Sequence, residues 1–171
     1  MSNTVILIGP EGSGKSTIGR IIANALSKEL LAERIYEEQG LWALYQHWKP
    51  FEYKAVTHLL QNARQEGDEF YGKVLDFGAG HSVFEDSQDL AHVEALMEPF
   101  GNVFLVVPCE DADEVVSVTE QRRGHELGLN RHFVEYPSNK RLAKHIVYTK
   151  DMTADECAER VLGIIGSRKG V

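Results

Sequence analysis

The segment of this 171-residue chain that says most about its fold is Gly9-Pro10-Glu11-Gly12-Ser13-Gly14-Lys15-Ser16-Thr17. It matches the Walker A pattern G-x-x-x-x-G-K-[ST] at every required position. A β-branched apolar run, Thr4–Ile8, precedes it, and an amphipathic helical pattern follows it over Ser16–Leu31. A strand, a glycine-rich turn and a helix in this order predict a loop that wraps around phosphate groups.

The residue types in this loop suit that chemistry. Glycines at 9, 12 and 14 let the backbone approach phosphate closely, because they carry no Cβ. The backbone N–H groups then point into one concavity at the positive end of the helix. Lys15 adds a charge for the β- and γ-phosphates, and the Ser16 hydroxyl is a ligand for Mg²⁺. We expect ATP to contact Gly9, Glu11, Gly12, Ser13, Gly14, Lys15, Ser16 and Thr17. The alternative is a glycine-rich turn that only begins a helix.

Strand and helix patterns alternate along the rest of the chain. Three more apolar runs, Lys73–Phe77, Asn102–Val107 and His145–Tyr148, read as strands covered on both faces of a parallel sheet. Helical spacing recurs over Phe51–Arg64, Leu90–Met97 and Ala112–Arg123, and a last helix begins at Thr153 with Glu156 in a capping box. The alternation predicts one three-layer α/β domain over residues 1–171, with a parallel sheet of about four strands. Thr4–Ile8 is expected in the middle, between Lys73–Phe77 and Asn102–Val107, with His145–Tyr148 beyond the latter.

Composition limits the function classes. Eighteen basic and 26 acidic residues give a net charge of −8, which argues against a general nucleic-acid coat or an anionic-membrane binder. Cys109 and Cys157 are too few for a disulfide framework or a zinc site, and we expect both as buried free thiols. The apolar start Val5–Ile8 is too short for a membrane span or a signal peptide. These features predict a soluble cytoplasmic protein, with its oligomeric state open.

A second acidic group and a small-residue turn follow the second strand. Asp76 ends that strand, on the sheet edge that carries the phosphate loop, where it is expected to hold Mg²⁺ or to activate an acceptor hydroxyl. An Asp that only caps the following turn is the alternative. Gly78, Ala79 and Gly80 leave room for a substrate that His81 orients or deprotonates; an exposed His in a tight turn is the other interpretation.

Two further segments invite a functional interpretation. Leu41–Pro50 is rich in aromatic residues (Trp42, Tyr45, His47 and Trp48), which favours either a short helix packed on the core or the wall of a substrate pocket. Gln121–His145 is locally basic. Because phosphoryl transfer needs positive charge at the γ-phosphate, we predict a lid over about residues 122–144. A solvated basic face is the alternative to that lid.

Together these motifs resemble the shikimate-kinase-like small-molecule kinases, in the nucleoside-monophosphate-kinase branch of phosphate-loop proteins. The resemblance rests on Ile8 to Arg20, on Val74-Leu75-Asp76-Phe77-Gly78-Ala79-Gly80, and on a run from His132 to Asn139 and Val147-Tyr148-Thr149 that is similar to a bacterial subgroup. It implies ATP and Mg²⁺ as cofactors and Arg122 against the adenine ring. It further implies a lid that begins near Arg123, with Arg131 as a γ-phosphate arginine.

One departure concerns the phosphoryl acceptor. The family has an Asp-x-Asp at the end of a second strand, whereas this chain runs from Leu30 to Glu38 with neither that motif nor a convincing strand. We therefore expect the second family strand to be absent or vestigial, and shikimate itself is doubtful as the acceptor. Glu37 or Glu38 could substitute, although a solvated helix face is the simpler interpretation.

The sequence thus predicts an ATP- and Mg²⁺-dependent kinase for a small hydroxylated metabolite, with Lys15, Asp76, Arg123 and Arg131 as its catalytic residues. A nucleotide sensor or slow ATPase is an alternative, because the Asp-x-Asp is missing. A kinase for a polynucleotide 5′-hydroxyl is a third hypothesis, which the net charge disfavours.

Overall fold

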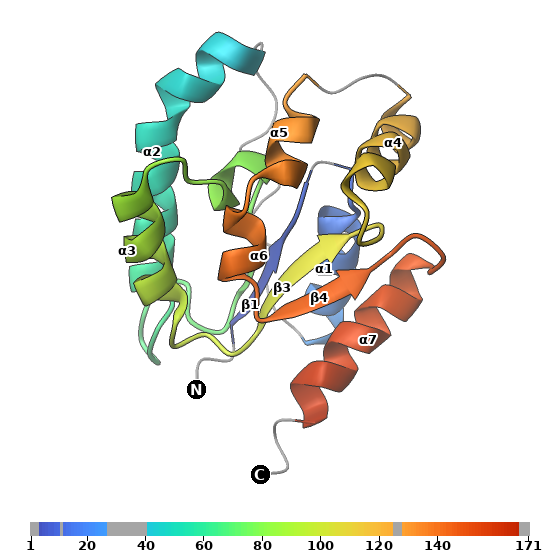
Figure 1. Ribbon diagram of the computed structural model, residues 1–171. Coiled ribbons are helices and arrows are strands. Elements are labelled where there is room, and N and C mark those ends of the chain that lie inside the picture. Colours follow the sequence, from blue (N-terminus) through green and yellow to red (C-terminus); the bar gives the residue numbers. More distant parts are fainter. Residues whose placement is uncertain (1–3, 11, 27–40, 125–127, 168–171) are drawn as a thin grey trace.

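A parallel sheet of four strands forms the centre of the computed structural model, which describes residues 4–10, 12–26, 41–124 and 128–167 (Figure 1). The strand order is β2-β1-β3-β4, and every neighbouring pair is parallel. The strands are β1 (Val5–Ile8), β2 (Val74–Asp76), β3 (Val103–Val107) and β4 (His145–Tyr148). This order confirms the arrangement expected from the sequence.

Helices lie between consecutive strands along the chain, and one follows the last strand. They are α1 (Lys15–Ala25), α2 (Leu41–Gln61), α3 (Ser87–Met97), α4 (Ala112–Arg123), α5 (Asn130–Glu135), α6 (Ser138–Leu142) and α7 (Ala154–Ser167), together with the short 3₁₀ helix η2 (Ala79–Ser82). Helices α2 and α3 lie on one side of the sheet, and α1 and α7 lie on the other (Figure 1). The three-layer architecture follows directly.

Alternation along the strands feeds two separate cores. Ile6, Ile8 and Leu75 point to the side of α2 and α3, where Leu60 and Val93 are fully buried against them. The alternate strand residues point to the side of α1 and α7, where they pack with Ile22 and Val161. They are Val5, Leu7, Val74, Phe104 and Val106. Because both faces of β1, β2 and β3 are covered, these strands read as continuous apolar runs. The same expectation is wrong for β4, because it is an edge strand and its Ile146 and Tyr148 side chains are exposed on one face.

Helix boundaries follow local signals in some places and tertiary contacts in others. Helix α4 spans the predicted residues, with Asp111 as its N-cap. The predicted capping box is also present, since Glu156 N–H donates to Thr153 Oγ1 (3.3 Å) and Thr153 N–H donates to Glu156 (2.7 Å). Helix α2, however, begins at Leu41 instead of Phe51 and carries Pro50 within it. The aromatic segment is therefore the first half of a long helix.

Some expectations are corrected and others fall outside the described residues. Cys157 is a buried free thiol as expected, but Cys109 is only half-buried, because it lies in the turn after β3. The expected absence of the second family strand, together with Glu37 and Glu38, concerns residues 27–40, which lie outside the described residues. The described helices include none with both the length and the apolar character needed to span a membrane.

Candidate active site

The loop between β1 and α1 has the conformation that its glycines predicted. Gly9, Gly12 and Gly14 all have positive φ (149°, 74° and 91°), which side-chain-bearing residues rarely adopt. Gly14 is the N-cap of α1 and provides no side-chain cap, so a ligand can use the first N–H groups of the helix. Glu11 and the side chain of Ser16 lie outside the description, and Thr17 is exposed in the first turn.

The Lys15 side chain folds back over this loop. Its ammonium donates to the carbonyl oxygen of Pro10 (2.7 Å) and lies 3.5 Å from Ser13 Oγ. The residue is only 7% exposed. A buried ammonium held at a glycine-rich helix N-terminus is a suitable partner for phosphate oxygens, because both contribute positive potential at one point.

Arg122 lies between the phosphate loop and the turn after β4. Its guanidinium is 3.5 Å from the Gly12 carbonyl oxygen and 3.4 Å from that of Thr149. A Cβ on Gly12 would lie 3.0 Å from the Thr119 carbonyl oxygen, so α4 lies directly against the loop. From its position in α4, Arg122 therefore contacts both the phosphate loop and the turn after β4. The adenine contact that the family resemblance implies for Arg122 stays a prediction.

Asp76 is the last residue of β2, next to the strand that leads into the phosphate loop. Its register partner is Leu7, two residues before Gly9. Burial has the largest effect on the pKa of His81, but the Asp76 carboxylate also raises it and the Lys15 ammonium lowers it, so both charges act on the His81 ring. A half-buried carboxylate at this sheet edge fits Mg²⁺, which prefers oxygen ligands and keeps waters.

His81 lies in η2 and is oriented by its own turn. The backbone N–H of Gly78 donates to His81 Nδ1 (2.9 Å), which assigns the hydrogen of the neutral ring to Nε2. Burial lowers the pKa of His81 below 6.5, and although Glu52 opposes this effect, the net direction is downward. The ring is therefore a neutral hydrogen-bond donor at neutral pH. The expectation of an exposed His in a tight turn does not describe this residue.

Lys49 and Glu52 of α2 belong to the same group, and the sequence analysis did not single them out. Lys49 Nζ donates to the carbonyl oxygens of Gly80 and Val83 (both 2.6 Å) and pairs with Glu52 Oε2 at 3.0 Å. A Cβ on Gly80 would lie 3.0 and 3.1 Å from the two Glu52 oxygens, and a Cβ on Gly78 would lie 2.8 Å from His81 Nδ1. The space that these glycines leave is therefore filled by the protein's own Glu52 and His81 side chains.

A second polar cluster connects α2 to α5. The Glu85 carboxylate accepts a hydrogen bond from the Tyr45 hydroxyl and lies 2.7 Å from His132 Nε2. Burial raises the pKa of Glu85, but the bonds from Tyr45 and His132 outweigh it, so the pKa lies below its ordinary value. Burial and the Glu85 bond raise the pKa of Tyr45. The cluster fixes α5 beside the first half of α2.

The predicted lid arginines lie on the surface. Arg131 is 55% exposed and pairs with Asp113 (2.8 Å) and Glu135 (2.7 Å), so its described contacts connect α5 to α4 and not to the phosphate loop. Arg123 is exposed in the last turn of α4. The structure thus brings Lys15, Asp76, His81 and Arg122 to one sheet edge and leaves Arg123 and Arg131 outside it.

A signal for the missed residues was present in the sequence. Tyr45, Lys49 and Glu52 follow one another at spacings of four and three, which puts them on one face of a helix. The aromatic residues of the same segment instead favoured a helix packed on the core or the wall of a substrate pocket, and neither interpretation uses the charges of Lys49 and Glu52. Glu85 and His132 had no such signal, because they lie 47 residues apart in the sequence and no local spacing connects them.

Neither a protein-family model nor a curated protein matches this chain. Solved structures do match in fold. Shikimate kinase from Acinetobacter baumannii in complex with shikimate is 18% identical, with a TM-score of 0.68 over 98% of this chain and 95% of that one. Gluconokinase from Sinorhizobium meliloti 1021 is 12% identical, with a TM-score of 0.56 over 96% and 91%. Deoxyadenosine kinase from M. mycoides with bound dATP is 15% identical, with a TM-score of 0.52 over 95% and 99%. The chain therefore has the fold of the phosphate-loop kinases, in agreement with the sequence resemblance.

Proposed function

We propose that this protein is a kinase that transfers the γ-phosphoryl group of ATP, with Mg²⁺, to a hydroxyl group of a small metabolite. The observation that carries the proposal is the buried Lys15 ammonium inside a positive-φ glycine loop at the N-terminus of α1. The shikimate kinases, the gluconokinase and the deoxyadenosine kinase with the same fold support the reaction class.

The nucleotide side of the site consists of the phosphate loop and Arg122. The loop N–H groups and Lys15 hold the β- and γ-phosphates, and Arg122 stacks on the adenine. Mg²⁺ would be held by Ser16 and Asp76, and when bound it neutralises charge on the transferred group. Catalysis on this side is positioning and charge neutralisation.

The acceptor side is the group formed by His81, Glu52 and Asp76. The acceptor hydroxyl oxygen forms a bond to the γ-phosphorus while the bond to the β–γ bridging oxygen breaks. ADP leaves with that oxygen, and the hydroxyl proton passes to a carboxylate or to water. The His81 Nε2–H donates to an acceptor oxygen, and Lys49 holds Glu52 and the η2 turn in place. A rigid turn of this kind favours a single acceptor orientation.

The experiment that tests the proposal is a ligand-stabilisation screen. The protein is heated with Mg²⁺, a non-hydrolysable ATP analogue and a panel of hydroxylated metabolites, and each hit is then assayed for ADP release. A ligand at 100 times its Kd should stabilise the protein by about 2.7 kcal/mol. ATP consumption that no metabolite in the panel accelerates would favour the rival interpretation of a slow ATPase or nucleotide sensor.

A further inference from the structure

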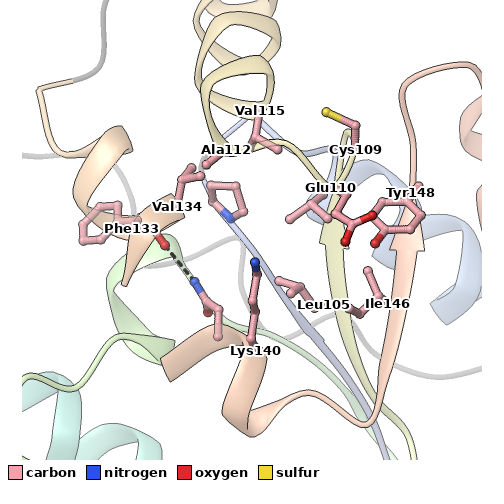
Figure 2. Close-up of a pocket in the computed structure, with 13 residues that line it drawn as sticks. Leu105, Cys109, Glu110, Ala112, Val115, Phe133, Val134, Lys140, Ile146 and Tyr148 are labelled. Atoms are coloured by element: carbon pink, nitrogen blue, oxygen red, sulfur yellow. Dashed lines mark hydrogen bonds between the residues drawn. The ribbon is translucent and has the colours of Figure 1, made fainter. Parts of the chain in front are cut away.

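A cavity that Pro10 of the phosphate loop lines in part lies against β3 and the edge strand β4 (Figure 2). Its floor includes Leu105 of β3 and Ile146 and Tyr148 of β4, and its far wall includes Phe133 of α5. The volume is about 170 Å³, smaller than the roughly 300–1,000 Å³ typical of drug-sized ligands. The cavity therefore suits a small molecule.

The apolar floor is open to solvent. Ile146 is 42% exposed and Tyr148 38% exposed, and they are two of only three large hydrophobic side chains that are exposed among the described residues. Both lie on the same face as Leu105 of the neighbouring strand, because Leu105 is the register partner of Ile146. Covering this face would remove apolar surface from water, which is favourable.

Two opposite charges line the same cavity without an ion partner. Lys140 reaches in from α6, and Glu110 comes from the turn after β3 (Figure 2). Within the described part of the chain neither forms a hydrogen bond or ion pair through its side chain, and they do not pair with each other. By contrast, neighbouring charges such as Arg141 and Glu94 form a bidentate pair. A cation and an anion are thus both available to one ligand.

A third polar group has unused capacity. Asn139 lines the cavity and is 4% exposed, and its amide nitrogen donates to the Phe133 carbonyl oxygen (3.0 Å). Its Oδ1 atom is buried and has no hydrogen-bond partner in the structure. Because Oδ1 has almost no accessible surface, a ligand in the cavity does not reach it, and Asn139 contributes to the wall of the cavity alone.

We infer that this cavity binds a small apolar zwitterion, of the kind represented by an apolar α-amino acid. Its carboxylate pairs with Lys140, and its ammonium pairs with Glu110. The apolar side chain covers Ile146 and Tyr148. The two unpaired opposite charges favour a zwitterion over a simple anion or cation, because either of these would leave one charge unmatched.

Calorimetric titration of the full chain with L-leucine and L-phenylalanine, without nucleotide, tests the inference. One saturable site is expected for both. L-leucinol lacks the carboxylate and N-acetyl-L-leucine lacks the ammonium, so each should bind at least about tenfold more weakly. Glycine has both charges but no apolar side chain and should also bind weakly.

Variants test the same contacts from the protein side. Lys140→Met and Glu110→Gln should each lower the affinity for L-leucine about tenfold or more, whereas Lys54→Met, on the exposed side of α2, should not change it. Circular dichroism checks that each variant is folded, and the ligand analogues give the same information without any substitution. Because no nucleotide is present, failure of the kinase proposal would leave this result unaffected.

Three outcomes would overturn the inference. The first is an absence of saturable binding of either amino acid to the folded protein at millimolar concentration. The second is equal affinity for leucine, leucinol and N-acetyl-leucine. The third is sedimentation showing a dimer that Ile146→Glu dissociates, since the exposed floor would then be covered by a second copy of this chain.

Discussion

The carbonyl oxygen of Val106 occupies the position that a side chain on Gly9 would need. A Cβ built on Gly9 would lie 2.1 Å from that oxygen, and the φ angle of Gly9 is 149°. The backbone at Gly9, directly after β1, thus passes so close to β3 that only glycine fits at this position. Gly9 therefore permits the close packing of β1 and β3, in addition to its proposed role in phosphate binding.

Gly9→Ala should therefore destabilise the fold, because the substitution adds a backbone clash to an unfavourable φ. We expect a loss above the roughly 1–3 kcal/mol of backbone strain alone, measured by chemical denaturation. Gly67→Ala is the matched control, since Gly67 also has positive φ (101°) but has nothing within 4 Å of its Cβ position. Equal losses in the two variants would contradict the clash.

Lys15→Ala should weaken ATP binding and abolish phosphoryl transfer. The ammonium is already positioned over the loop by the Pro10 carbonyl oxygen, so its removal takes charge from the phosphates without opening the core. Calorimetry with Mg-ATP measures the affinity, and circular dichroism checks the fold. Unchanged affinity in the folded variant would rule out the phosphate-loop interpretation.

Asp76→Asn should keep nucleotide binding but lower turnover by ~10²-fold or more, the scale of a lost acid–base or electrostatic group. The amide keeps the size of the carboxylate but removes its charge and its basicity. Titration with the ATP analogue and steady-state assays on an acceptor from the screen separate the two effects. Normal turnover would show that another acid serves the site, and Glu52 would be the first described candidate.

The two arginines should differ in which kinetic constant they change. Arg122→Ala should raise the Kd for ATP, because Arg122 already lies against Gly12 and Thr149. Arg131→Ala should lower kcat with a smaller effect on affinity, because its charge would be used only in a closed transition state. That role requires Arg131 to leave Asp113 and Glu135. If Arg131→Ala has full kcat, Arg131 serves only the α4–α5 contact.

The stability of the protein should fall as the pH drops below about 6.5, partly because of His81. Its pKa is lowered in the folded state, so below its ordinary value of 6.5 the unfolded chain binds more protons than the folded one. The contribution of His81 to the free energy of unfolding is complete above pH 6.5 and is lost as the pH falls through the lowered pKa of the folded state. Denaturation at pH 5.5 and 7.5 should show a smaller difference in His81→Gln than in the wild type. The exposed His58→Gln should behave like the wild type, and an unchanged difference in His81→Gln would contradict the assignment of a buried neutral ring.

Sequence patterns alone were enough to predict the phosphate loop, the four strands and their order. These features depend on residues that are close in the chain: glycine spacing between 9 and 14, continuous apolar runs, and caps such as Thr153 with Glu156. Local conformation and strand burial follow from such spacing, because one short segment contains all of the atoms that decide it. The rule of right-handed crossovers then restricts the strand order.

Only the tertiary structure decided which side chains meet beside the loop. Lys49 reaches the Gly80 carbonyl oxygen across 31 residues of sequence, and His132 reaches Glu85 across 47. Such contacts depend on how α2 and α5 lie across the ends of the strands, a property of the whole core that no local pattern encodes. The same physics placed Arg131 in ion pairs with Asp113 and Glu135, although the family resemblance had implied that it is a γ-phosphate ligand.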